Sequence, residues 1–221
     1  MTSRSGDAPR STRHPRDEDD QLRQDLITAA NRLLENSGTH ESLSLHAVAR
    51  DAGVAETSAY LHFPDKMALV LAVYQRHFAD LARRVDQAVA EFTGPAARLR
   101  AAVVAYCQFA AEHPEAYYVM FSMPGLVNPA DPIPDGQRPG AALIGSVQNV
   151  IIECIDAGLM HPADPYQATL CLWAALHGLI SLRVGRPQVP WPPFDALVDT
   201  LITSLLCPEG RMRQAPPDTM A

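Results

Sequence analysis

Apolar residues recur at helical spacing wherever this sequence has a regular pattern, and that feature narrows the possible folds most. Between residues 22 and 34, leucines and alanines follow one another mostly three or four positions apart, as on one face of an α-helix. The same period returns along most of the chain, whereas no segment alternates apolar and polar residues as a half-buried strand does. The sequence therefore predicts an all-α fold.

Glycines and prolines divide the periodic segments into about nine helices. Gly38 ends the first helix, Gly53 separates two short ones, and Pro64 precedes a long amphipathic one. We expect helices over residues 20–37, 45–52, 56–62, 65–91, 96–112, 115–123, 141–157, 166–184 and 194–206. Residues 124–140 are crowded with proline and glycine and are expected to form a loop.

The composition fits a helical protein that needs no metal, cofactor or disulfide. The chain has 221 residues, 47% of them apolar, which suffices for a sizeable core. Its four cysteines are scattered without a CxxC or CxH pair, so we expect neither a zinc site nor a disulfide framework. The N-terminus lacks a signal-peptide pattern, and the most apolar stretch, residues 168–184, is shorter than a typical membrane span of about 20 residues. We therefore expect that stretch to be a buried helix, and the protein to be cytoplasmic with no membrane partner.

Charge is unevenly distributed along the chain. The formal net charge of −7 counts against a nucleic-acid binder, whereas residues 1–16 hold four arginines against a single acid, Asp7. An acidic run at residues 17–20 follows this basic arm. Residues 1–18 and 208–221 are polar and lack periodicity, so we expect both ends to be disordered.

Residues 45–62 have the pattern of a helix-turn-helix. Two short helices are joined at Gly53, a residue that readily adopts the positive φ of a tight turn. Ala49 permits the two helices to cross closely, and Val54 fills the angle between them. Ser44 is the predicted N-cap of the first helix.

The continuation of this pattern carries a family resemblance. The motif Leu45-x-x-Val48-Ala49-x-x-Ala52-Gly53-Val54 is followed by Tyr60-x-His62-Phe63-x-x-Lys66-x-x-Leu69. From Leu22 to Leu69 this stretch closely resembles the N-terminal signature of the TetR (tetracycline-repressor) family of transcriptional regulators. The resemblance implies a DNA-binding domain over residues 19–66 and a helical ligand-binding and dimerisation domain over residues 67–207.

The resemblance also places the helix of residues 56–62 in the DNA major groove. The groove-facing positions that it implies are Glu56, Thr57, Ser58 and Leu61. The implied phosphate contacts are Ser44, Tyr60, His62 and Lys66. Three of these have an ordinary alternative: Tyr60 can be a packing residue, His62 a helix cap and Lys66 a solvated surface charge. Phe63 is expected in the core.

The chain departs from the family pattern at the start of this helix. Ala55 stands where a serine or threonine usually caps the helix, at a cost of about 1 kcal/mol in helix-end stability. Ala59 replaces a bulkier aliphatic residue. Glu56 brings a negative charge near the DNA, although a carboxylate suits a helix N-terminus and can accept a hydrogen bond from cytosine N4. These departures leave the base contacts open.

The C-terminal part has no pattern of a catalytic site. It contains no GxSxG, HExxH or glycine-rich phosphate loop, so we expect no enzymatic activity. Large aromatic and methionine side chains are frequent there, and these line ligand pockets as well as ordinary cores. Trp173 and His177 lie one helical turn apart, and Gly178 allows another helix to approach closely. Together with residues 113–123 they resemble the C-terminal type of a TetR subgroup named for its Trp, His and Gly. The candidate pocket residues are Tyr106, Tyr117, Phe121, Trp173 and His177.

The last two helices are the expected dimer interface, because they offer more apolar surface than one chain covers. The residues concerned are Leu170, Ala174, Leu179, Leu182, Leu197, Leu201, Ile202 and Leu205. In TetR-like proteins such helices pair across a twofold axis, which suits a palindromic operator.

The sequence thus supports one principal hypothesis and one alternative. The principal hypothesis is a homodimeric DNA-binding transcriptional regulator, a repressor or an activator, that binds a palindromic double-stranded operator. A small apolar or aromatic effector would release it from the DNA. The alternative is a helical interaction protein whose DNA-binding head is degenerate.

Overall fold

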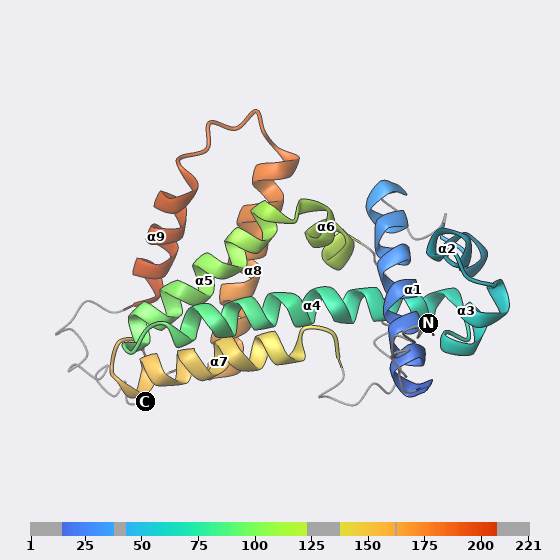
Figure 1. Ribbon diagram of the computed structural model, residues 1–221. Helices are drawn as coiled ribbons and strands as arrows, with labels where there is room; N and C mark the ends of the chain where they lie inside the picture. The colour runs from blue at the N-terminus through green and yellow to red at the C-terminus, as the bar shows by residue number, and fades with distance from the viewer. Residues whose placement is uncertain (1–14, 38–42, 123–137, 162, 207–221) are drawn as a thin grey trace, which may run out of the picture. The chain divides into compact units, whose positions relative to one another are not determined.

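The computed structural model describes residues 15–37, 43–122, 138–161 and 163–206. These residues form nine α-helices and no strand, which confirms the predicted all-α fold (Figure 1). The helices are α1 Pro15–Ser37, α2 Leu45–Ala52, α3 Glu56–His62, α4 Lys66–Ala90, α5 Pro95–Glu112, α6 Pro114–Ser122, α7 Ala141–Asp156, α8 Pro165–Gly185 and α9 Phe194–Leu205. Residues 15–18, which we assigned to a disordered arm, are therefore helical. The rest of that arm, residues 208–221 and most of the predicted 124–140 loop lie outside the described residues.

The chain divides into two compact units, residues 1–73 and 74–221. The division falls inside α4, so the start of this helix belongs to the first unit and the remainder to the second.

The first unit is built from three helices that pack around small and medium apolar side chains. α1 packs against α2 and α3, and α2 packs against α3. Leu26, Val48 and Ala59 contribute one buried side chain from each helix. Arg32 on α1 and Asp51 on α2 form an ion pair of 2.7 Å across the surface of this unit.

The turn between α2 and α3 has the predicted helix-turn-helix geometry. Gly53 adopts the left-handed conformation with φ 71°, and the Val54 N–H donates to the Ala49 carbonyl oxygen at 2.9 Å. At the other end of α2, the Ser44 Oγ accepts a hydrogen bond from the Ala47 N–H at 3.1 Å, which confirms Ser44 as the N-cap. These two ends fix the length of α2 and the direction in which α3 leaves it.

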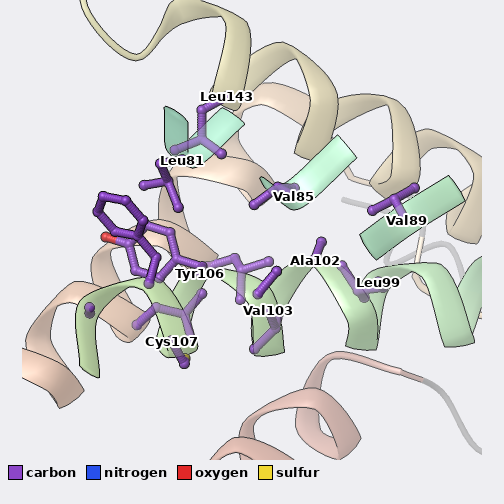
Figure 2. Close-up of a cluster of buried hydrophobic side chains, with 14 of the residues drawn as sticks. Leu81, Val85, Val89, Leu99, Ala102, Val103, Tyr106, Cys107 and Leu143 are labelled. Carbon is purple, nitrogen blue, oxygen red and sulfur yellow. The ribbon is translucent and has the colours of Figure 1, made fainter. Parts of the chain in front are cut away.

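The second unit has α5 at its centre. α5 packs against α6, α7, α8 and α9, and α7 also packs against α8. Side chains of the second part of α4 face those of α5 in the core that Figure 2 shows. The labelled residues are Leu81, Val85 and Val89 of α4, Leu99, Ala102, Val103, Tyr106 and Cys107 of α5, and Leu143 of α7.

Helix α8 differs from the buried helix that we expected. It has 21 residues and is long and apolar enough to cross a membrane by length and composition, a test that core helices of soluble proteins also pass. Only 22% of its most apolar window is buried within this chain. A Cβ added at Gly178 would meet no atom within 4 Å, so the close helix approach predicted there is absent from the described part of the chain.

The conformation of Gly53 can be tested by substitution with alanine. Gly53→Ala should lower the free energy of unfolding by about 1 kcal/mol, because an alanine Cβ strains a residue with positive φ even where space is free. Gly145→Ala is the matched control, since it lies inside α7 with free space around its Cβ and should raise the free energy by about 0.5–1 kcal/mol. Urea unfolding followed by circular dichroism measures both. Equal effects of the two substitutions would contradict the assigned turn geometry.

Candidate functional site

Helix α3 buries one side and exposes the other. Ala59 is fully buried, whereas Leu61 keeps 86% and Tyr60 keeps 52% of its surface exposed. Thr57 and Glu56 lie one turn before these two residues and are also exposed, and Ser58 is half-buried. Thr57 and Leu61, with Glu56 and Tyr60 beside them, therefore form the outer face of α3, which we call the α3 face.

His62 does not share the α3 face. It lies three positions after Ala59 and so turns toward the buried side of the helix. Its side chain is only 8% exposed, and its Nε2 lies 3.5 Å from the Asp19 Oδ1 of α1. The predicted phosphate contact of His62 is thus not supported by its placement, because the ring is packed beside an acid. Phe63 is buried, as expected, with the Arg23 guanidinium 5.1 Å from its ring centroid.

The first residue of α3, Glu56, pairs with a histidine of α2. Ala55 makes no side-chain cap, in agreement with the loss expected from the sequence. The Glu56 Oε2 lies 3.0 Å from the His46 Nδ1 of α2, and both side chains remain about half or more exposed. Such an exposed pair adds little to stability, but it holds the carboxylate toward α2.

Two further predicted phosphate contacts, Ser44 and Lys66, lie outside α3. Ser44 is exposed, and while its Oγ accepts from the helix its own O–H remains available to donate to a phosphate. Lys66 is the first residue of α4 and is half-buried. At this helix end the Asp65 Oδ1 accepts from the Ala68 N–H at 2.8 Å, so this amide already has a partner. The positive charge of Lys66 is the feature of this helix end that suits a phosphate.

In the second unit, the five candidate pocket residues come together from three helices. Tyr106 of α5, Tyr117 and Phe121 of α6, and Trp173 and His177 of α8 form a continuous set of ring contacts. Their centroids lie between 4.7 Å, for Phe121 with Tyr117 and with His177, and 6.3 Å, for Trp173 with His177. We call this group the aromatic cluster.

A hydrogen-bond chain runs through the aromatic cluster. The Tyr106 and Tyr117 hydroxyl oxygens are 3.2 Å apart, the Tyr117 hydroxyl is 2.8 Å from the His177 Nδ1, and the His177 Nε2 is 3.4 Å from the Ser181 Oγ. Burial raises the pKa of Tyr106 to about 12, also raises the pKa of Tyr117, and lowers the pKa of His177. A neutral His177 can then accept from Tyr117 at Nδ1 while it donates to Ser181 at Nε2.

A cavity of about 880 Å³ lies beside the aromatic cluster, and we call it the large cavity. Its size suits a drug-sized ligand. Its walls are Tyr74 and Phe78 of α4, Met120 and Phe121 of α6, residues 138–140, Ala141, Leu143, Ile144, Gly145 and Gln148 of α7, and Tyr166, Leu170 and Trp173 of α8.

The candidate pocket residues divide between this cavity and its surroundings. Phe121 and Trp173 line the large cavity, whereas Tyr106 lines an adjoining void of about 30 Å³, which has room for about one or two waters and which Trp173 also lines. Tyr117 and His177 line neither space, and their polar atoms bond to each other. Leu170, which we assigned to the dimer interface, also lines the large cavity, and its place in that interface stays a prediction.

Comparison with known proteins identifies the family of the chain. Residues 26–73 match the model of bacterial regulatory proteins of the tetR family, and residues 99–205 match that of the tetracyclin repressor-like C-terminal domain. The chain belongs to the TetR family. Members of this family are soluble transcription regulators, not enzymes, that bind DNA and small-molecule ligands, usually as dimers.

Individual relatives agree with this assignment. The chain is 35% identical over 125 residues to the HTH-type transcriptional activator FasR of Mycolicibacterium smegmatis, a match over 57% of this chain and 55% of FasR, about half the length of that relative. A protein of unknown function from Rhodococcus sp. RHA1 is 30% identical, with a TM-score of 0.68 over 83% of this chain and 95% of that one. The transcriptional regulator FadR from Bacillus subtilis, solved in complex with stearoyl-CoA, shares the fold at 15% identity, with a TM-score of 0.64 over 81% of this chain and 95% of FadR.

Several residues of this TetR-family chain gained a role only from the structure. His46 and Glu56 pair across a turn although they are ten positions apart, and no sequence motif predicts this pairing. Asp65 directly before α4 is an N-cap residue by type, a signal that the sequence did offer. Tyr74 and Phe78 stand on the apolar stripe of α4, and their periodicity shows that they face inward but not that a cavity lies there.

The lowered pKa of His177 predicts a pH dependence of stability. Because the unfolded chain binds a proton at His177 more readily than the folded one, stability should be full above the unfolded pKa, near 6.5, and fall as pH drops below it. His77 of α4, whose pKa burial also lowers, contributes in the same direction. His177→Asn should therefore flatten the decline of the melting temperature between about pH 7.5 and 5. His161→Asn, at an exposed histidine, is the matched control, and an unchanged slope in His177→Asn would contradict the burial of a neutral imidazole.

Proposed function

We propose that the protein is a cytoplasmic, homodimeric transcriptional regulator that binds a palindromic DNA operator and responds to a small apolar or aromatic effector. The α3 face is the observation that carries this proposal. A leucine that is 86% exposed on a seven-residue helix is not explained by the core, but it suits contact with a thymine methyl group in the major groove.

The proposed DNA-binding domain covers residues 19–66, and its contacts divide into two kinds. Thr57, Leu61 and, at the edge, Ser58 are the proposed base-reading positions, while Ser44, Tyr60 and Lys66 are the proposed phosphate contacts. Glu56 stays a candidate for cytosine N4, a contact for which its carboxylate would leave His46. His62 is proposed as a positioning residue, because its buried ring fixes the end of α3 against α1.

The proposed ligand-binding and dimerisation domain covers residues 67–207, and the large cavity is its proposed effector site. Phe121 and Trp173 line that cavity and belong to the aromatic cluster, so a ligand there touches the cluster directly. The Trp173, His177 and Gly178 pattern supports assignment to the TetR subgroup named for these residues. A ligand that displaces α4 would change the separation of the two α3 helices of a dimer and weaken operator binding, a coupling of about 1–3 kcal/mol.

The proposed dimer interface lies on α8 and α9. These helices lie apart in Figure 1 and each packs against α5, while Leu182 of α8 is 52% exposed. Ile202 leaves the predicted interface, since it is buried in the core of its own chain, whereas Leu197, Leu201 and Leu205 remain half-buried. The open space at Gly178 can accept a helix of the second copy.

Repression by steric occlusion of a promoter is our first proposal for the regulatory sign, and activation is the second. The name of the FasR relative as a transcriptional activator favours the second. A reporter gene placed behind the selected operator, with and without the protein, decides between them.

The DNA contacts can be tested by substitution once a site has been selected from random sequences. Lys66→Ala should weaken binding about equally for all sequences and reduce the slope of log affinity against log salt by about 1. Leu61→Ala should instead lower discrimination at one base pair of each half-site by about 1 kcal/mol. Arg83→Ala removes the same charge from an exposed position of α4 in the second unit and should change neither. No DNA binding by the wild-type protein, even at low salt, would favour the interaction-protein alternative.

The dimer interface can be tested by placing a charge on α8. Leu182→Glu should weaken the dimer by roughly thirtyfold, or about 2 kcal/mol, because the carboxylate would lose water on association. Phe92→Glu, at a residue that is 46% exposed between α4 and α5, introduces the same charge elsewhere and should leave the dimer intact. Analytical ultracentrifugation measures both, and an intact Leu182→Glu dimer would remove this part of α8 from the interface.

A further inference from the structure

The hydroxyl group of Tyr74 is buried without a partner. Tyr74 lies on α4 and is only 5% exposed. Among the residues that the structure describes, its hydroxyl is the one buried side-chain polar atom without a hydrogen bond, whereas the hydroxyls of Tyr106 and Tyr117 bond to each other. An unpaired buried donor costs free energy, so native proteins seldom keep one unless a further molecule completes it.

The surroundings of Tyr74 indicate which kind of molecule could accept a hydrogen bond from its hydroxyl. Tyr74 is a wall residue of the large cavity, together with the aromatic rings of Phe78, Phe121 and Trp173. Phe78 and Phe121 meet edge to face with centroids 5.7 Å apart, and both rings also line the cavity. The cavity therefore places an extensive apolar surface beside the tyrosine that carries the unsatisfied hydroxyl. Because the hydroxyl oxygen itself has almost no accessible surface, a ligand reaches it by a small shift of the Tyr74 side chain. Gln148 and Tyr166 add further polar side chains to the wall.

Charge around the cavity narrows the class of ligand. Arg138 is the one charged residue among the described wall residues, and it is exposed to solvent. A carboxylate or ammonium group at the depth of Tyr74 would lose its hydration without a buried counter-charge. Burial also raises the pKa of Tyr74, so its hydroxyl stays protonated and can donate at neutral pH.

We infer that the large cavity binds an uncharged, mainly apolar molecule through one oxygen acceptor that takes the hydrogen bond of Tyr74. This inference deepens the proposed effector site and rests on that proposal for its regulatory meaning only. The ligand class is an aromatic or aliphatic ketone, ester, ether or alcohol, in contrast to an organic acid or amine.

Three probes with the same ring system test the ligand class on the wild-type protein. Naphthalene carries no acceptor, 2-acetylnaphthalene carries a neutral one, and 2-naphthoate carries a charged one. Isothermal titration calorimetry without DNA should give 2-acetylnaphthalene an affinity roughly three- to tenfold above naphthalene, with 2-naphthoate the weakest of the three. Equal affinities of the ketone and the hydrocarbon, tightest binding of the acid, or binding of none of the three would each overturn the inference.

The variant Tyr74→Phe tests the role of the hydroxyl itself. It should remove the advantage of 2-acetylnaphthalene and leave the affinity for naphthalene within about twofold. Without ligand its melting temperature should equal or exceed that of the wild type, because an unpaired polar group has been removed. Tyr118→Phe, at a half-exposed tyrosine of α6, is the matched control. A retained preference for the ketone, or a lower melting temperature of the unliganded variant, would show that Tyr74 already has another partner.

These measurements are separate from the test of DNA binding. Failure of operator binding with the probe order intact would refute the proposed regulator and leave the ligand site standing. If the protein binds an operator but the three probes do not bind in the expected order of affinity, the ligand site is refuted and the proposed regulator stands. Ketone binding that leaves operator affinity unchanged would refute only the proposed release from DNA.

Discussion

The apolar stripe of α4 is the constraint on which the rest of the structure depends. Leu69, Val70 and Val73 are fully buried at its beginning, and Leu81 and Val85 are fully buried farther along. One continuous helix of 25 residues thus supplies core side chains to both units. The same helix carries Lys66, the proposed phosphate contact, and Tyr74, the proposed ligand contact, so the two functions share one covalent element.

Polar groups of the first unit are arranged so that an acidic chain can still present a DNA-binding surface. Asp51 pairs with Arg32, Glu56 with His46, and Asp65 with the backbone at the start of α4. Each pairing directs a carboxylate to a partner in the protein. The net charge of −7 therefore says little about the α3 face, on which the uncharged Tyr60 and Leu61 are exposed beside Glu56.

The helical spacing of apolar residues and the residues that begin or end helices predicted most of the fold, because both depend on neighbours in the sequence. The ends of α2 follow from Ser44 and Gly53, and the buried faces of α4 and α5 follow from residues such as Val85 and Val103. The five residues of the aromatic cluster were predicted together as a pocket wall, and of these Phe121 and Trp173 line the large cavity. Tyr117 shows the limit of such reasoning, since its residue type suits a pocket wall while its hydroxyl is in fact satisfied by a neighbour 60 positions away.

The remaining differences have a common physical cause. His62, Leu170, Ile202 and Gly178 were each assigned to the correct helix, but what a side chain meets depends on the element packed against it. His62 meets Asp19, Leu170 meets a cavity and Ile202 meets the core of its own chain. Sequence spacing shows on which side of a helix a residue lies and not which group lies opposite, so these partners required the three-dimensional structure.

The most direct test of the central claim uses the fact that Lys66 is the only lysine in this sequence. Amine-specific acylation followed by mass spectrometry therefore reports on one side chain at the proposed DNA interface. The account predicts that a DNA site selected by the protein slows acylation of Lys66 several-fold, and that high salt restores the rate of the free protein. Acylation at an unchanged rate while the protein is bound to its selected DNA would show that DNA does not lie against the start of α4.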